Sequence, residues 1–544
     1  MSLSRDRLRS WAPPLALLVV VLLSYGLWIP WLGMYGDDLP YLWYYHLLGP
    51  WGPGQFAAMD RPASSLFYAA VTLVLSENVW LYHVLLLVLR WSSGLLLWWV
   101  LRLVWPERNQ EAALAGMLFV VYPGFRQNPI ALEFILHLAV LDLFLLSLGT
   151  MLLAVCCPQK RILWTLLSLV SAAGPFFLEY FIGLEVLRPV FLWCLTRRPG
   201  MAGKKQWSRI FWAWFPALGV VLAFLIWRVF IFSFRTYQPV LLNQLRADPL
   251  IGLLQLGFSV VRDLWISLGG AWRLVFQFPQ NQRLLLEDLL LSGACVGIIL
   301  FLFNRMKRFP VQPPPYPDQK KDDWGEMILG IGLASMLAGG AIFWLTGIPV
   351  SIEFPWDRST LSLMLGASLV GVGLLEMLAA PRYRLLLAAI LVGLAVGSHF
   401  QNALVYRAEW KKLQSFFWQL TWRAPGLEPG TLILFDVIPL NRYSDNDLTA
   451  LLNWTYAPDL NTRQIPFKFF DLTIRLDSEY EGLPALEKGL PVEHNHRGLF
   501  FKTTTSDTLA VHYNPPDCLV VLSPEDTHLP DCLAGYPMCF QLPA

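Results

Sequence analysis

Long apolar runs without charge constrain this chain more than any other feature of its sequence. The first run, over residues 12–32, contains no charged side chain and is long enough to cross a hydrocarbon layer of about 30 Å. Of the 544 residues, 56% are hydrophobic and only 15% are charged, whereas soluble domains carry about 25% charged residues. The sequence therefore predicts a polytopic α-helical membrane protein.

The Lys and Arg bias of the short loops predicts how the chain crosses the membrane. Basic residues gather in five segments that we expect on the cytoplasmic side: the N-terminus, 160–161, 197–209, 305–321 and 382–384. With these segments inside, the eleven predicted crossings are 12–32, 79–104, 111–123, 129–155, 162–177, 180–195, 210–232, 284–304, 327–347, 360–379 and 384–400. The N-terminus is then cytoplasmic and the C-terminus extracytoplasmic, in a plasma membrane. Two further apolar runs, 63–75 and 249–268, would break this parity, so we expect them to lie at the outer interface or to re-enter.

The predicted topology places a set of polar residues on the outer side. The outer loop, 33–78, contains two adjacent acids in the stretch GDDLPYLWYYH, beside aromatic residues of the kind found at membrane interfaces. The whole outer set consists of Asp37, Asp38, Asp60, Arg61, Arg126, Gln127, Glu179, Tyr180, Asp357 and Arg358. Because the inner loops carry little besides Lys and Arg, we expect any chemistry on the outer side.

The composition changes near residue 401 to that of a soluble domain. The pattern predicts an amphipathic helix at 406–423, buried strands at 431–440 and 518–525, and a hairpin over 499–513 that turns at Ser506 and Asp507. The tail is thus expected to form a small α/β or α+β domain.

These features divide the chain into two predicted domains. A transmembrane domain, 1–400, includes a cytoplasmic proline-rich loop at 305–324, and an extracytoplasmic domain occupies 401–544. If the tail is outside, its cysteines could form one disulfide, but three thiols leave one over and the sequence does not give the pairing. The three cysteines are Cys518, Cys532 and Cys539.

Five stretches carry a resemblance to a known family: the acid pair after the first span, the DRP tripeptide at 60–62, and the segments 78–104, 113–144 and 353–368. Together they resemble the GT-C superfamily of integral-membrane glycosyltransferases. Within the superfamily the sequence is most similar to protein O-mannosyltransferases and related bacterial enzymes, although Asp357 stands where those enzymes usually have Glu. The likeness covers the region up to about residue 150 and one later loop.

The resemblance implies an outer active site, a fold of eleven or more membrane helices, and a sugar donor linked to polyprenyl phosphate. Topology favours the same donor, because nucleotide sugars are made inside and an outer-face enzyme needs a sugar that has already crossed on a lipid. In the family the acid beside the first span is usually the base, so Asp37 is the predicted catalytic base with Asp38 assisting. The alternative is that only one acid matters and the other caps the helix that begins at 39–41.

The departing lipid phosphate needs a positive counter-charge, because its negative charge grows in the transition state. Arg61, Arg126 and Arg358 are the candidates, with Arg358 preferred, although each could instead reach toward lipid headgroups. The remaining predicted substrate-binding residues are Asp60, His83, Gln127, Glu179, Tyr180 and Asp357. No metal-ligand set is predicted, and dependence on a divalent ion is left open.

The predicted function is sugar transfer from a polyprenyl-phosphate donor to a hydroxyl on a protein, lipid or glycan. Two other functions remain open: a transporter or flippase of lipid-linked sugars, and a non-catalytic membrane scaffold whose tail binds a partner. The net charge of +2 and pI near 8.1 give no support for a nucleic-acid partner, which needs a clustered basic face.

Overall fold

The computed structural model describes residues 2–197, 203–232, 240–307, 323–476, 482–483, 485, 487–514 and 518–522. The chain divides into two compact units. The first comprises Met1–Pro30, Leu81–Asn128 and Phe134–Leu404, and the second Trp31–Trp80, Pro129–Glu133 and Val405–Ala544. The loop that carries the acid pair thus belongs to the same unit as the tail, whereas sequence analysis grouped it with the membrane helices. Most of the proline-rich loop, and both Cys532 and Cys539, lie outside the described residues.

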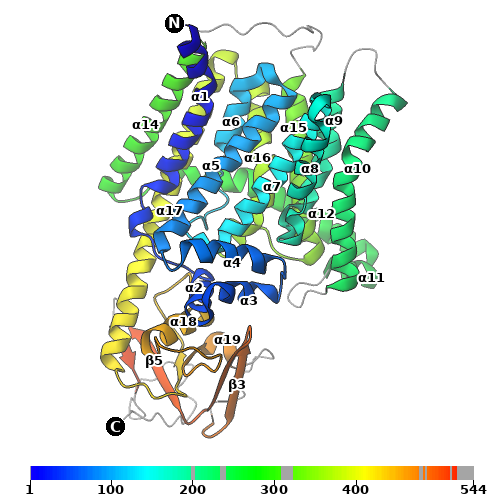
Figure 1. The fold of residues 1–544 in the computed structure, drawn as a ribbon. Helices are drawn as coiled ribbons and strands as arrows, with labels where there is room; N and C mark the ends of the chain where they lie inside the picture. Colours follow the sequence, from blue (N-terminus) through cyan, green and yellow to red (C-terminus); the bar gives the residue numbers. More distant parts are fainter. Residues whose placement is uncertain are drawn as a thin grey trace. The chain divides into compact units, whose positions relative to one another are not determined.

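The first unit is built from long apolar helices (Figure 1). Within the described ranges, nine helices are long and apolar enough to cross a membrane. Their main segments are α1 (Ser2–Val21), α5 (Val79–Val104), α7 (Ala131–Cys156), α10 (Lys204–Ile226), α12 (Pro249–Trp265), α14 (Gln282–Lys307), α15 (Trp324–Thr346), α16 (Leu361–Leu378) and α17 (Pro381–Arg423). A polytopic helical membrane protein is therefore confirmed at this coarser level.

The predicted set of crossings differs from these nine in four places. Helices α6 (Asn109–Val120), α8 (Arg161–Ser171) and α9 (Leu187–Thr196), where three crossings were expected, have only 12, 11 and 10 residues. Helix α8 ends before the Gly174-Pro175 dipeptide, which begins a 3₁₀ turn. The apolar run therefore continues beyond the end of the helix. Conversely, the run predicted to lie at the interface forms a helix at Pro249–Phe276 that is long enough to span.

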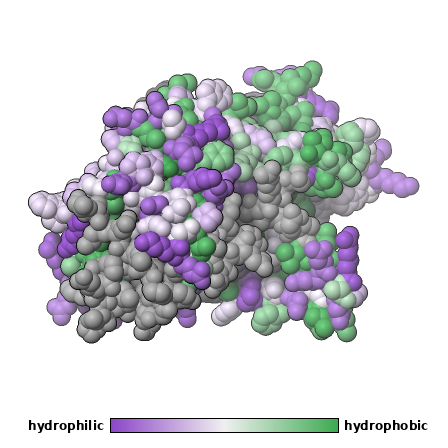
Figure 2. All heavy atoms as spheres, turned by 90° about the horizontal axis from the view of Figure 1, so that it is seen from below, coloured by the Kyte–Doolittle hydropathy of each residue, from purple (hydrophilic) through white to green (hydrophobic). Residues whose placement is uncertain are grey.

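Helix α12 shows how the first unit exposes apolar surface. Its exposed side chains include Leu250, Leu254, Phe258, Val261 and Trp265, with exposed fractions of 66–72%. They recur every three or four residues and so form one stripe, as expected for a helix that faces lipid. Figure 2 shows that hydrophobic side chains gather in areas of the surface on the face that it displays.

Helices α15 and α16 approach each other through small residues. A Cβ added to Gly339 would lie 2.3 Å from the carbonyl oxygen of Ser362, and one added to Gly366 would lie 2.5 Å from that of Gly332. Only glycine permits this backbone approach, which is the usual way in which membrane helices pack closely. The loop between these two helices carries Asp357 and Arg358.

The second unit combines short helices with two small sheets. Before the tail it contains α2 (Asp38–Leu48), α3 (Gly52–Ala58) and α4 (Ser64–Leu75). The tail adds α18 (Asp445–Tyr456), α19 (Leu472–Arg475), β1 (Leu432–Phe435), β2 (Lys468–Asp471), β3 (Pro491–His496), β4 (Leu499–Thr504), β5 (Thr508–Asn514) and β6 (Cys518–Val521). One sheet has the order β2-β1-β5-β6, and β3 pairs with β4 in the other.

The tail confirms the predicted strands but not their pairing. Strand β1 is parallel to both β2 and β5, with Leu432 opposite Lys468 on one side and Thr508 on the other. Strands β4 and β5 were expected to form a hairpin, and this is wrong, because β4 pairs with β3 and β5 with β1 and β6. The buried β5 thus has two neighbours in a mixed sheet, β1 in parallel and β6 in antiparallel orientation, instead of one neighbour in a hairpin.

One long helix replaces two predicted segments at the end of the membrane part. Sequence analysis expected a crossing at 384–400 and a separate amphipathic helix at 406–423. In the structure α17 runs without interruption from Pro381 to Arg423. No proline or glycine occurs between 398 and 423 to end the helix, so the change in polarity does not coincide with a change in backbone structure.

Candidate functional site around the acid pair

A tight turn places the two acids in different surroundings. Gly36 adopts a φ of +50°, a conformation that side-chain-bearing residues rarely adopt. The amide of Asp38 donates to the carbonyl of Tyr35 at 3.1 Å, and α2 begins there. Asp37 is exposed at the start of this helix, whereas Asp38 has no exposed surface. The adjacent carboxylates are therefore not equivalent.

Asp38 caps the first turn of a helix distant in sequence. Its Oδ2 accepts a hydrogen bond from the amide of Ala131 at 2.7 Å, and its Oδ1 accepts one from the amide of Glu133 at 2.9 Å. These are amides of the first turn of α7, which have no partner within their own helix. The alternative predicted for the pair, that one acid caps the helix beginning at 39–41, is wrong: Asp37 makes no side-chain cap to α2, and Asp38 caps α7 instead.

Burial sets the protonation behaviour of Asp38. It raises the pKa of the carboxyl well above the ordinary value, the amide of Glu133 opposes this, and the charges of Glu133 and Asp37 add to it. A carboxyl that is enclosed and already bonded to two amides is poorly placed to accept a proton from a substrate. Of the two acids, Asp37 is the one exposed to solvent.

The tail supplies a guanidinium to the same cluster. Strands β3 and β4 are joined by the two residues Arg497 and Gly498, with φ values of +51° and +86°, as in a type I′ hairpin turn. Arg497 bonds Asp60 at 2.8 Å and donates to the carbonyl oxygen of Phe56 at 2.9 Å. Its guanidinium also lies 4.4 Å from the ring centre of Phe56. The hairpin tip is thereby attached to the loop that holds the acid pair.

Electrostatics connects Arg497 with Asp37. Burial acts to lower the pKa of Arg497, but Asp60 first, and then Tyr41 and Asp37, raise it above its ordinary value. The charge of Asp37 also helps burial to raise the pKa of Asp447, in α18. Asp37 is therefore an exposed carboxylate within electrostatic range of both a guanidinium and a buried acid.

Aromatic side chains enclose the cluster. The rings of Tyr41 and Tyr68 are stacked with centres 4.5 Å apart, and Phe56 lies 4.5 Å from Tyr41 in an edge contact. Burial raises the pKa of Tyr68 well above its usual value, and the positive charge of Arg61 opposes this. Arg61, predicted to bind substrate, is thus close to this aromatic group. No group of three metal-ligating side chains occurs among the described residues.

A second polar group, in the first unit, contains four other predicted site residues. Asp357 is buried and accepts hydrogen bonds from the backbone amide of Arg126 at 2.8 Å and from the side chain of Gln127. Gln127 also donates to the carbonyl of Pro355 at 2.8 Å. Arg358 is partly exposed, and its guanidinium lies 5.2 Å from the ring centre of Trp356. The two segments identified from the sequence, 126–127 and 357–358, therefore do contact each other. The hydrogen bonds of Asp357 hold the backbone of the 126–127 turn in place.

The remaining predicted residues lie in packed parts of the first unit. His83 is buried in α5, and Glu179 begins a 3₁₀ helix, Glu179–Val186. The ring of Tyr180 lies 4.9 Å from His137 and 5.2 Å from Phe343. The contacts of Tyr180 are those of a core residue.

The membrane helices contain a further group of buried polar residues. Arg90 in α5 has no exposed surface and donates to the carbonyl of Val120 at 2.9 Å. Asp142 in α7 accepts hydrogen bonds from Ser92 and Ser93. Both serines belong to α5, so a neighbouring helix satisfies Asp142.

Sequence reasoning missed Arg497 and Asp447, although both belong to the acid-pair cluster. The Arg497-Gly498 dipeptide between two alternating strands is a recognisable turn signal, but nothing in the sequence relates that turn to Asp60. Comparisons with protein-family models, curated proteins and solved structures found no match to this chain.

Proposed function

We propose that this protein is a membrane glycosyltransferase of GT-C type, using a polyprenyl-phosphate-linked sugar and a hydroxyl acceptor at the outer face of a plasma membrane. The observation that supports this proposal best is the difference between the two acids, since Asp38 is buried and Asp37 is exposed. Asp38 is enclosed and caps α7, which fixes the backbone of the exposed Asp37 within electrostatic range of Arg497. An accessible carboxylate on a fixed backbone, near a guanidinium, suits general-base chemistry.

The proposed reaction is an inverting transfer. Asp37 accepts the proton of the acceptor hydroxyl while the hydroxyl oxygen forms a bond to the anomeric carbon of the sugar. The bond between that carbon and the phosphate oxygen breaks, and the electron pair leaves with the polyprenyl phosphate. Arginine is suited to the growing negative charge, because its planar guanidinium presents paired donors and stays protonated. Arg497 and Arg61 are the second-unit candidates, while a role for Arg358 stays a prediction.

The test is donor consumption by the purified full-length protein. We expect one of a panel of polyprenyl-phosphate sugars to be consumed when a hydroxyl acceptor is present, and Asp37→Asn to slow consumption by about 10²–10⁴-fold, the usual contribution of a general base. Asp459→Asn, which neutralises another exposed acid in the second unit, is the matched control and should retain activity. Full activity in Asp37→Asn would exclude Asp37 as the base.

A transporter of lipid-linked sugars is the second candidate, supported by the buried Arg90 and Asp142. Ionisable groups inside membrane helices frequently mark a transport path. Liposomes that contain the protein and a labelled donor separate the two functions. Movement of the intact donor between leaflets, without consumption, would favour transport over transfer.

A further inference from the structure

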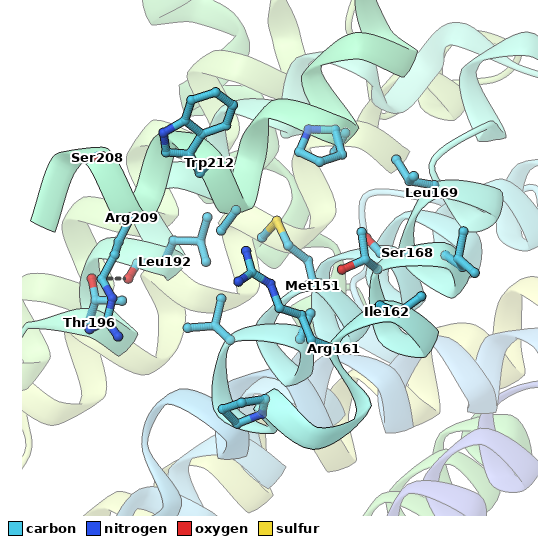
Figure 3. Close-up of a pocket in the computed structure, with 18 residues that line it drawn as sticks. Met151, Arg161, Ile162, Ser168, Leu169, Leu192, Thr196, Ser208, Arg209 and Trp212 are labelled. Atoms are coloured by element: carbon cyan, nitrogen blue, oxygen red, sulfur yellow. Dashed lines mark hydrogen bonds between the residues drawn. The ribbon is translucent and has the colours of Figure 1, made fainter.

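A cavity of about 740 Å³ lies in the first unit among α7, α8, α9 and α10. Figure 3 shows its lining, which includes Met151 from α7, Leu169 from α8, Leu192 from α9 and Trp212 from α10. Its volume falls in the range of about 300–1,000 Å³ that is typical of ligand pockets. None of its lining residues belongs to the acid-pair cluster (Asp37, Asp38, Asp60, Asp447 and Arg497) or to the Asp357 group (Arg126, Gln127, Asp357 and Arg358).

The charged lining of this cavity is purely basic. Its 18 lining residues, all in the described part of the chain, include Arg161 and Arg209 but no aspartate or glutamate. In Figure 3 Arg161 extends from α8 into the cavity, and Arg209 extends from α10 toward Thr196. A neighbouring hollow is lined by Lys204, Lys205, Ser208 and Arg209. One end of the cavity therefore favours an anion.

The rest of the lining is mainly apolar and borders lipid-facing surface; its other polar members are the hydroxyl residues Thr165, Ser168, Thr196 and Ser208. Ile162 and Leu166 of α8 and Trp212 of α10 all line the cavity, and their exposed fractions are 78%, 56% and 61%. Apolar side chains with this exposure, on helices of a membrane protein, face hydrocarbon chains. A small soluble anion would leave most of this lining without a partner, whereas a lipid would fill both parts.

We propose that this cavity binds an anionic phospholipid, with its phosphate between Arg161 and Arg209 and one acyl chain along the lining formed by Met151, Leu169 and Leu192. Basic pockets between membrane helices commonly bind anionic lipid headgroups. Arginine is suited to the phosphate, because its planar fork can donate two parallel hydrogen bonds. The site is separate from the proposed sugar-transfer chemistry and does not depend on it.

Lipid retention on the full-length protein tests the proposal. The protein is purified in detergent, incubated with phosphatidylglycerol or phosphatidylcholine, and analysed by native mass spectrometry. We expect phosphatidylglycerol to bind in preference, and Arg161→Gln/Arg209→Gln to weaken its binding on the order of 30-fold, since each cation near a lipid headgroup contributes about 1 kcal/mol. Arg161→Lys/Arg209→Lys should restore a large part of the binding.

Two further variants distinguish a lipid site from a general effect of surface charge. Arg246→Gln/Arg382→Gln removes two exposed cations that do not line the cavity and should leave binding unchanged. Ala213→Trp keeps every charge but fills the apolar part, and should also weaken phosphatidylglycerol binding. Equal retention of both lipids, unchanged binding in the Arg161/Arg209 glutamine variant, or full displacement by millimolar inorganic phosphate would overturn the proposal.

Discussion

The acid pair of the second unit and the Asp357-Arg358 pair of the first unit are built alike. In each, one of two adjacent polar residues is buried and accepts hydrogen bonds from the amides of a distant segment, and its neighbour reaches the surface. Asp38 bonds the amides of Ala131 and Glu133, and Asp357 bonds the amide of Arg126. The pairs differ in the neighbour, which is an acid in one and a guanidinium in the other.

This difference shows that residue type alone does not reveal which member of a pair is accessible. Asp37 and Asp38 are chemically identical, and only the contact with α7 distinguishes them. Asp357 and Arg358 have opposite charges and are adjacent, yet Asp357 bonds the 126–127 turn. In both pairs the buried carboxylate satisfies backbone amides that would otherwise lack a partner. Substituting each member in turn tests whether the buried members are structural and their neighbours are not.

The largest expected effect is on stability at the acid pair. Asp38→Ala removes the acceptor of one buried and one partly buried amide. It should lower the free energy of unfolding by about 2–5 kcal/mol, because a donor left unsatisfied costs roughly 1–3 kcal/mol when it is buried and less when water can reach it. Asp37→Ala removes an exposed carboxylate and should change stability by less than about 0.5 kcal/mol. Thermal unfolding of the purified variants in detergent measures both. Equal shifts for the two variants would remove the distinction between them.

The Asp357 group should show a smaller loss of the same kind. Asp357→Ala leaves the amide of Arg126 without its acceptor, so we expect a loss of about 1–3 kcal/mol. Gln127 retains its bond to the carbonyl of Pro355, which limits the effect. Arg358→Gln is the matched control and should leave the unfolding midpoint nearly unchanged. A midpoint lowered as far by Arg358→Gln as by Asp357→Ala would show that this pair is not divided as the acid pair is.

The difference between local and distant contacts also explains which parts of the fold and of the candidate site could be predicted from the sequence. Long apolar runs identified most long helices, and short apolar runs identified strands β1 and β6, because this signal depends on neighbouring residues. Hydropathy failed at α8, where Gly174-Pro175 follows the helix although the apolar run continues. The capping of α7 by Asp38 joins positions 93 and 95 residues apart, and no local pattern encodes such a contact. Some segments that meet in these polar groups were therefore predictable, while the contributions of Arg497 and Asp447 and the role of each residue were not.

Acid should destabilise the second unit through two histidines of β3. Burial lowers the pKa of His494 to about 2 and that of His496 to about 3, with Lys468 adding to both shifts. The unfolded chain takes up these protons near pH 6.5 and the folded unit does not, so stability is complete above that pH and falls as the pH decreases. Between pH 6.5 and 5.5 each histidine should remove about 1 kcal/mol.

Hydrogen exchange resolves this effect by region. Peptides from β3 and β4 should lose protection on acidification, beyond the intrinsic change in exchange rate, while peptides from α15 and α16 should not. His494→Gln should reduce the pH dependence of the β3 and β4 peptides by about half, since one of the two titrating groups is removed. If the variant and the unaltered protein show the same pH dependence, His494 does not titrate as described.

The smallest expected effect is at the ion pair between the hairpin tip and the acid-pair loop. Arg497 and Asp60 are 27% and 13% exposed and 2.8 Å apart, so solvent screens their attraction only in part. A double-mutant cycle with Arg497→Gln and Asp60→Asn should give a coupling energy of about 1 kcal/mol, near the upper end for partly exposed pairs. The coupling should decrease at high salt, because screening weakens the attraction.

The exposed pair Lys502–Glu493, at 70% and 65% exposure, serves as the matched control. Its coupling should be smaller, and an equal value would show that Arg497 is no more tightly held than a surface cation.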